Sequence, residues 1–377
     1  MNSLVMNKDM SKSMNLLRFP LALAVVYLHC SGTINTIPYK DGFDTQFVDL
    51  LRIAISHVIT HLAVPSFFLI SGYLYFKEGV LTKSLWITKQ KKRLFTLLIP
   101  YLLWNMIPLL YILAKRIGAA CINGAWENVG RYWASIDWIH LFWDLEPLNE
   151  TSQNLFEVLT PLAGPINFPL WYLRDLILLT MLSPLIYLLI KRGKIYFPIF
   201  LFVCFLSGIW FTHRILPIIG IFFFSFGGYF SINKIDFLNE KIVKSFVLKL
   251  FTVFTLGVAI FYDGMNTYIG TIAYKLFILA GVCMIFHIAH VAVKKGISIK
   301  KWLVDASFLI YVSHFVFVFL INIHVMALER FLNDACQLLL IVDYLLYPLL
   351  ITACCLLTGW ILHKLFPVFY RFLIGSR

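Results

Sequence analysis

The sequence predicts an all-α integral membrane protein with about ten transmembrane helices and both termini in the cytoplasm. Of its 377 residues, 60% are hydrophobic and only 14% are charged, which is more apolar side chain than a single soluble core buries. Apolar stretches of membrane-spanning length, roughly 17 to 25 residues, recur along the chain. The basic residues cluster between these stretches, in a pattern that sets the orientation of a membrane protein.

Each apolar stretch is expected to be a helix, because backbone polar groups have no water partners in lipid. The ten expected spans are 16–32, 57–76, 94–114, 170–190, 195–211, 215–231, 246–262, 271–293, 302–324 and 337–362. Only KRGK at 191–194 separates the fourth span from the fifth, and Pro348 is expected to kink the tenth. We expect one polytopic domain over 1–377, with a long external loop at about 115–168.

The distribution of Lys and Arg predicts the orientation. Of 32 such residues, 23 lie in or at the edge of segments that the ten-span topology places in the cytoplasm, 8 lie in or near external segments, and Arg174 lies at a helix end. This asymmetry is typical of inner-membrane proteins. The net charge of +13 is therefore attributed to topology, and no nucleic-acid partner is expected. No small-residue cleavage site follows His29, so we expect the first span to be retained in the membrane.

Cysteine and histidine spacings predict no metal site. The seven cysteines show no CxxC or Cys/His pattern, and most fall inside apolar spans as small hydrophobic residues. His57 and His61 share a helical face, but no HExxH motif accompanies them, and we interpret them as a boundary face.

Two polar residues on the first span are the strongest functional candidates. Arg18 and His29 enclose the stretch RFPLALAVVYLH, and eleven residues are close to three helical turns, so both side chains lie on one face about 16.5 Å apart along the axis. A neutral imidazole can accept a proton from a hydroxyl, and a guanidinium can bind phosphate through two hydrogen bonds. The alternatives are a snorkelling anchor for Arg18 and a structural, hydrogen-bonded His29.

Several segments resemble the motifs of one family. Arg18 and His29 match an Arg-x10-His signature on the first helix, and four further segments follow in the expected order: VPSFFLISGYLY (64–75), KKRLFTLLIPYLLWN (91–105), PLWYLRDLILL (169–179) and SFLIYVSHF (307–315). Together they resemble the acyltransferase-3 family of multi-pass membrane acyltransferases.

The resemblance implies transfer of an acyl group from acyl-CoA, entering from the cytoplasm, to a hydroxyl of a cell-envelope carbohydrate or similar acceptor. It implies His29 as the catalytic base and Arg18 as its partner near the donor. Acetyl is the expected acyl group, with succinyl or longer groups as alternatives. Acyl-CoA is then a substrate, and no permanently bound cofactor is expected. Whether the protein forms a homo-oligomer stays open.

The resemblance also suggests donor-binding residues. Arg93 follows a run of lysines and is expected to meet the phosphates of the coenzyme. Many family members carry a second Arg three residues later, where this chain has Thr96, so a paired-arginine clamp is in doubt. Ser71 and Gly72 are small residues that let a thioester tail, or a neighbouring helix, approach closely.

Acceptor binding is assigned to Trp171, Arg174, Tyr311 and His314. Arg174 is adjacent to Asp175, and because neighbours on a helix do not share a face, we expect each to pair with another group. For both residues the alternative to orienting an acceptor is neutralising charge at the membrane boundary. Tyr311 and His314 are three residues apart on one face.

Alternative functions and mechanisms stay open from the sequence. A helical bundle with intramembrane His and Asp residues also suits a proton-coupled transporter or flippase for an envelope glycan. A family member that has lost catalysis and serves in envelope assembly is a third possibility. Direct attack by the acceptor and an acyl-histidine intermediate give the same products.

Overall fold

The structure is a computed structural model that describes residues 3–30, 47–144, 164–210, 215–238, 245–262, 267–333 and 337–375. Throughout these ranges the regular structure is helical, without a strand, so the all-α prediction is confirmed. The helices are α1 (Ser3–His29), α2 (Phe47–Arg52), η1 (Ile53–Val58), η2 (Ile59–Leu62), α3 (Ala63–Tyr75), α4 (Lys83–Arg93), η3 (Leu94–Leu98), α5 (Ile99–Asn123), α6 (Trp126–Ala134), α7 (Trp138–Trp143), η5 (Phe168–Leu170), α8 (Trp171–Met181), α9 (Ser183–Gly193), α10 (Tyr196–Ser207), α11 (Ile218–Ile232), α13 (Phe246–Phe261), α14 (Tyr268–Lys294), α15 (Lys301–Asn333), α16 (Gln337–Leu365) and α17 (Pro367–Leu373).

Every predicted span overlaps a helix, but the helices differ in length. Within the described residues, five continuous helical segments are long and apolar enough to cross a membrane: Phe47–Tyr75, Lys83–Asn123, Tyr268–Lys294, Lys301–Ile321 and Leu338–Leu365. A sixth is obtained if Phe168–Met181 and Ser183–Gly193, which are bent by 64° at their junction, form one broken span. Helices α10, α11 and α13 are apolar but shorter. The count of ten spans therefore stays a prediction.

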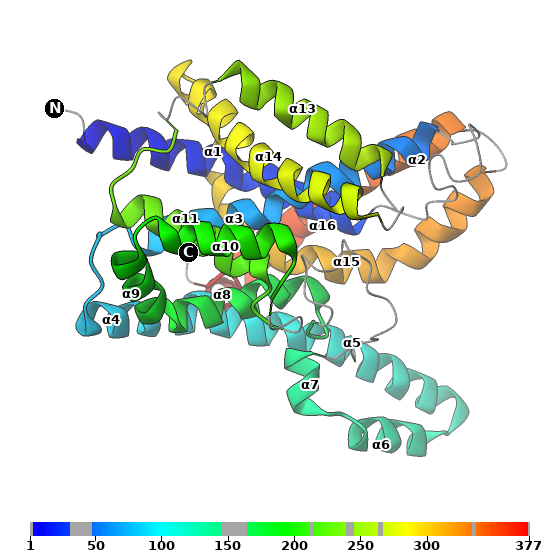
Figure 1. Cartoon of the computed structure of the whole chain (residues 1–377). Helices are drawn as coiled ribbons and strands as arrows, with labels where there is room; N and C mark the ends of the chain where they lie inside the picture. The colour runs from blue at the N-terminus through cyan, green and yellow to red at the C-terminus, as the bar shows by residue number, and fades with distance from the viewer. Residues whose placement is uncertain are drawn as a thin grey trace.

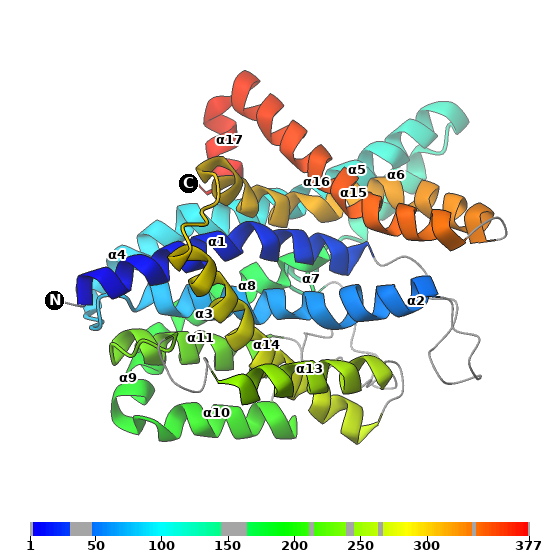
Figure 2. The same cartoon turned by 90° about the horizontal axis from the view of Figure 1, so that it is seen from above.

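Helix α1 also lies inside the bundle. Its polar residues lower its mean hydropathy, so it is not one of the five segments that are long and apolar enough to cross a membrane. It packs against α3, α14, α15 and α16, and Figure 2 shows it running between α3 on one side and α15 and α16 on the other. Ala22 and Val26 are fully buried one turn apart on it. The bundle thus surrounds the helix that carries Arg18 and His29.

Basic helix ends gather at one end of the molecule. The start of α1, helix α4, the end of α9 and the end of α14 lie towards the same end in both views (Figures 1 and 2), and each carries Lys or Arg residues. This arrangement agrees with the charge pattern of the sequence. Which end faces the cytoplasm, and the side on which the termini lie, stay predictions.

Much of the described part of the segment expected as an external loop is helical. Helix α5 continues to Asn123 and is followed by α6 and α7, which extend away from the bundle in Figure 1. Trp126, Trp133 and Trp138 on these short helices are 43–55% exposed, which suits either interfacial anchoring or sugar contact. Residues 145–163 of that segment lie outside the described residues.

Helices α3 and α11 approach so closely that glycines are required between them. A Cβ added at Gly72 would lie 1.9 Å from the backbone oxygen of Phe224, and one at Gly227 would lie 2.2 Å from that of Leu69. Backbone atoms cannot move aside as a side chain can, so Gly72 is explained by helix packing.

We expect Gly72→Ala to destabilise the protein by at least about 2 kcal/mol, because the added methyl group forces α3 and α11 apart. The measurement is thermal unfolding in one detergent. Gly257→Ala on α13 is the matched control: no atom lies within 4 Å of its added Cβ, and alanine favours the helix. Equal unfolding temperatures for the two variants would contradict the packing role.

Candidate active site

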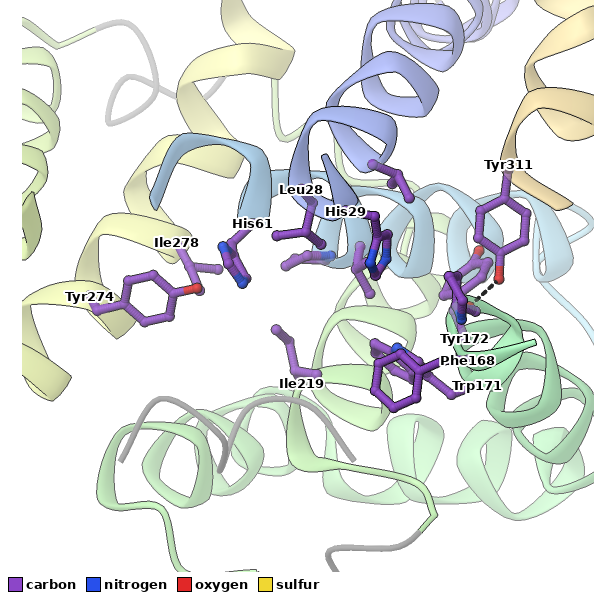
Figure 3. Close-up of a pocket in the computed structure, with 14 residues that line it drawn as sticks. Leu28, His29, His61, Phe168, Trp171, Tyr172, Ile219, Tyr274, Ile278 and Tyr311 are labelled. Carbon is purple, nitrogen blue, oxygen red and sulfur yellow. Dashed lines mark hydrogen bonds between the residues drawn. The ribbon is translucent and has the colours of Figure 1, made fainter. Parts of the chain in front are cut away.

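One pocket in the bundle is formed around His29. This histidine pocket has a volume of about 220 Å³. Figure 3 shows the imidazole of His29 pointing into it from α1, with His61 on one side and Tyr311 on the other. The lining residues are Val25, Leu28, His29, His61, Val64, Pro65, Phe168, Pro169, Trp171, Tyr172, Ile219, Tyr274, Ile278 and Tyr311. Aromatic rings and two imidazoles therefore meet in a mostly apolar space.

Irregular helical turns help to shape this pocket. The continuous helix Phe47–Tyr75 contains a π-helical turn, η1, followed by a 3₁₀ turn, η2. Such turns rotate side chains away from α-helical register and are frequent at functional sites. His61 lies in η2 and its ring makes an edge contact with that of Tyr274, 5.6 Å between centroids.

A second pocket contains the positive charges. This basic pocket has a volume of about 410 Å³. It is lined by Arg18, Phe67, Ile70, Ser71, Leu74, Lys92, Arg93, Thr96, Leu97, Tyr172, Leu173, Leu176, Thr180, Val304, Asp305, Ser307, Phe308 and Tyr311. Three cationic side chains and one carboxylate thus line the same space, and the excess of positive charge favours an anionic ligand.

Two tyrosines belong to both pockets. Tyr172 and Tyr311 line the histidine pocket and the basic pocket, and their rings meet edge to face at 5.6 Å between centroids. The hydroxyl of Tyr311 donates to the carbonyl of Pro169 at 2.7 Å, while that of Tyr172 lies 3.1 Å from Ser71 Oγ. The pockets are therefore neighbours that share a wall of two aromatic side chains.

The comparisons with known proteins agree with this geometry. The profile of the family described as "Acyltransferase domain", Acyl_transf_3, matches residues 11–364. The chain belongs to the acyltransferase-3 family. It is also similar to the succinoglycan biosynthesis protein ExoH of Rhizobium meliloti (strain 1021), with 29% identity over 191 residues, or 50% of this chain. That stretch is 45% of the relative, so the similarity spans less than half of its length. No solved structure matches.

In this acyltransferase-3 protein, most residues selected from the sequence lie in one of the two pockets. Arg18, Ser71 and Arg93 line the basic pocket. His29 and Trp171 line the histidine pocket. Tyr311 lines both. The two ends of the Arg-x10-His motif thus open into neighbouring spaces, as expected for two depths on one face of α1.

Arg174 lies outside the lining of both pockets, and the expectation about its partner was wrong. It is 1% exposed and its Nε donates to Asp175 Oδ1 at 2.9 Å; Nη1 donates to the carbonyl of Trp143 at 2.5 Å. Adjacent helical residues point about 100° apart, but the long Arg side chain bends back to its neighbour. Arg174 therefore joins α8 to α7.

Gly72 and His314, which were also selected from the sequence, are likewise absent from the lining of these two pockets.

Both pockets contain polar residues that were not selected from the sequence as site residues. His61, Tyr172 and Tyr274 line the histidine pocket, and Lys92 lines the basic pocket. The absence of an HExxH motif favours a boundary face for His61, whereas in the structure its ring lines the pocket from the 3₁₀ turn η2, which an α-helical register does not anticipate. Tyr172 stands inside the recognised segment PLWYLRDLILL, which is the one signal that pointed to it.

Proposed function

We propose that this protein transfers an acyl group, with acetyl as the first expectation, from acyl-CoA to a hydroxyl of a cell-envelope carbohydrate in the bacterial inner membrane. The observation that carries the proposal is the pair of adjoining pockets, one with Arg18 and Arg93 and the other with His29. Family membership favours this activity over the transporter considered from the sequence.

The donor fits the two pockets in one orientation. Acyl-CoA carries its phosphates at one end and its thioester at the other, joined by a long, thin arm. Arg18, Lys92 and Arg93 suit the phosphate end, because charge-assisted hydrogen bonds to phosphate are strong. The thioester would then pass Tyr172 and Tyr311 to reach His29, about 16.5 Å along α1 from Arg18.

The proposed reaction begins with proton transfer from the acceptor hydroxyl to His29. The acceptor oxygen forms a bond to the thioester carbon, the carbon–sulfur bond breaks, and the thiolate leaves and takes a proton. The proposed hydrogen-bond donors to the tetrahedral oxyanion are the hydroxyls of Tyr172, in the wall between the pockets, and of Ser71, which lies 3.1 Å from it in the basic pocket. An acyl-His29 intermediate, formed and then attacked by the acceptor, gives the same products.

The histidine pocket suits a carbohydrate acceptor. Phe168, Trp171 and Tyr274 present aromatic rings, and aromatic rings pack against the apolar faces of sugars while hydroxyls find polar partners. The similarity to a succinoglycan biosynthesis protein supports an acceptor of this class.

The experiment that tests the function uses the purified protein in nanodiscs with an isolated envelope polysaccharide. Acetyl-CoA and succinyl-CoA, each radiolabelled in the acyl group, are supplied in parallel. We expect base-labile label in the polysaccharide from one donor, with release of one CoA per label. A transporter would bind polysaccharide without releasing CoA, and absence of label from both donors in a folded protein would contradict the proposal.

A further inference from the structure

His314 is buried immediately beside His29 without lining either pocket. It lies on α15, is 0% exposed, and its ring centroid is 5.3 Å from that of His29, with the ring planes at 35°. Helices α1 and α15 pack directly against each other. Among the described residues, His29 also contacts the ring of Phe315, at 5.4 Å between centroids, and a phenyl ring supplies no hydrogen-bonding group.

The backbone of α15 determines which nitrogen of His314 carries a proton. Nδ1 lies 2.8 Å from the carbonyl oxygen of Tyr311 and 3.1 Å from that of Ile310. Carbonyl oxygens only accept hydrogen bonds, so Nδ1 is the donor and carries the proton. In the neutral imidazole, Nε2 then keeps a free lone pair.

Nε2 of His314 is buried and has no hydrogen-bond partner among the described residues. An unsatisfied buried polar atom carries a free-energy cost and calls for an explanation. A hydrogen bond of about 2.9 Å between the nitrogens of two facing imidazoles places the ring centres little more than about 5 Å apart, close to the separation observed here. We expect a rotation of the His29 ring to close this bond, because catalytic hydrogen bonds commonly tighten only when substrate is bound.

We propose that His314 is a positioning residue for His29, an inference that rests on the proposed function. Its Nε2 accepts the N–H of one His29 nitrogen, so that the other nitrogen presents its lone pair to the acceptor hydroxyl in the histidine pocket. The same bond stabilises the imidazolium that forms when His29 takes the proton. A carboxylate has this role in serine hydrolases, and a neutral imidazole supplies it here without placing a charge deep in the membrane.

This role differs from the acceptor binding assigned to His314 from the sequence. A residue that binds the acceptor acts through the acceptor KM, whereas a residue that orients the base acts through kcat. The hydrogen bonds of His314 Nδ1 go to backbone carbonyl oxygens, and substitutions of neighbouring side chains leave these oxygens in place. The fold itself therefore determines the tautomer of His314.

Two substitutions at position 314 test the proposal. His314→Phe keeps a ring of similar shape but removes the lone pair, and His314→Gln keeps an acceptor oxygen near the position of Nε2. We expect His314→Phe to lower kcat about tenfold with KM values for acyl-CoA and acceptor nearly unchanged, and His314→Gln to restore most of the loss. Equal kcat for the Phe and Gln variants, or loss confined to the acceptor KM, overturns the proposal.

A spectroscopic measurement separates this proposal from the proposed function. The protein is labelled with ¹⁵N-histidine, and the His29 signals are assigned as those absent from a His29→Gln variant. We expect these signals to show one tautomer of His29 in the wild-type protein and a mixture of both tautomers in His314→Phe. An identical tautomer distribution in both proteins overturns the positioning role even if acyl transfer occurs. A wild-type protein with one His29 tautomer and no acyl transfer would instead contradict the function and leave the His29–His314 contact supported.

Discussion

Replacing His29 with alanine is expected to lower kcat for acyl transfer by about 10³-fold, with the KM for acyl-CoA nearly unchanged. A positioned general base contributes roughly 10²- to 10⁴-fold to such a reaction. His29 is the ionisable side chain at the end of α1 that points into the histidine pocket (Figure 3). The donor phosphates are expected at the other pocket, so donor affinity should survive. The measurement is steady-state transfer of labelled acyl group in nanodiscs.

His363→Ala is the matched control for this substitution. His363 lies on α16, is exposed, and is not among the residues that line either pocket. The same chemical change there should leave kcat within about twofold, as expected for surface positions. A comparable loss in both variants would point to a general effect on the protein rather than to catalysis.

Replacing Arg18 with alanine is expected to raise the KM for acyl-CoA by about 30- to 100-fold, with a smaller effect on acceptor affinity. A hydrogen bond to a charged group is worth roughly 1.5–3 kcal/mol, and Arg binds phosphate through two. Arg18→Lys should fall between wild type and Arg18→Ala, because an ammonium keeps the charge but loses the planar, two-point geometry. The measurement is the KM of each variant for both substrates.

A donor without phosphates makes the test of Arg18 specific. With acetyl-pantetheine in place of acetyl-CoA, wild type and Arg18→Ala should show the same KM, because the groups that Arg18 binds are missing. Arg131→Ala on α6 is the matched control, since Arg131 is exposed and pairs with Glu127 at the surface. An effect of Arg18→Ala that persists undiminished with acetyl-pantetheine would remove the phosphate role.

The positions of the helices followed from the sequence because apolar length is a local property. Each predicted span overlaps a helix of the structure, and Arg18 and His29 lie at two depths of one helix, as their spacing indicates. The length of each helix was less predictable. The bend of 64° between α8 and α9 lies next to Pro184 in the first turn of α9, and the length of the apolar stretch gives no sign of it.

The residues of the site were only partly predictable, because some reach it through an irregular turn and others through contacts between helices that are distant in the sequence. His61 enters the histidine pocket through an irregular turn that α-helical periodicity does not contain. His314 and His29 meet because α1 packs on α15, a contact between residues nearly 300 positions apart. The sequence left Arg174 open between orienting an acceptor and neutralising charge, and its buried contacts with α7 and Asp175 appear only in the folded chain.

The central claim is that His29 acts on an acyl group delivered from the basic pocket, and single-turnover kinetics tests it most directly. Excess purified protein is mixed with labelled acetyl-CoA and acceptor, and label in the acceptor is followed by rapid quenching. For wild type and a folded His29→Ala protein that both bind the donor, the account predicts rate constants that differ by about 10³-fold. Equal rate constants for label transfer in the two proteins would contradict it.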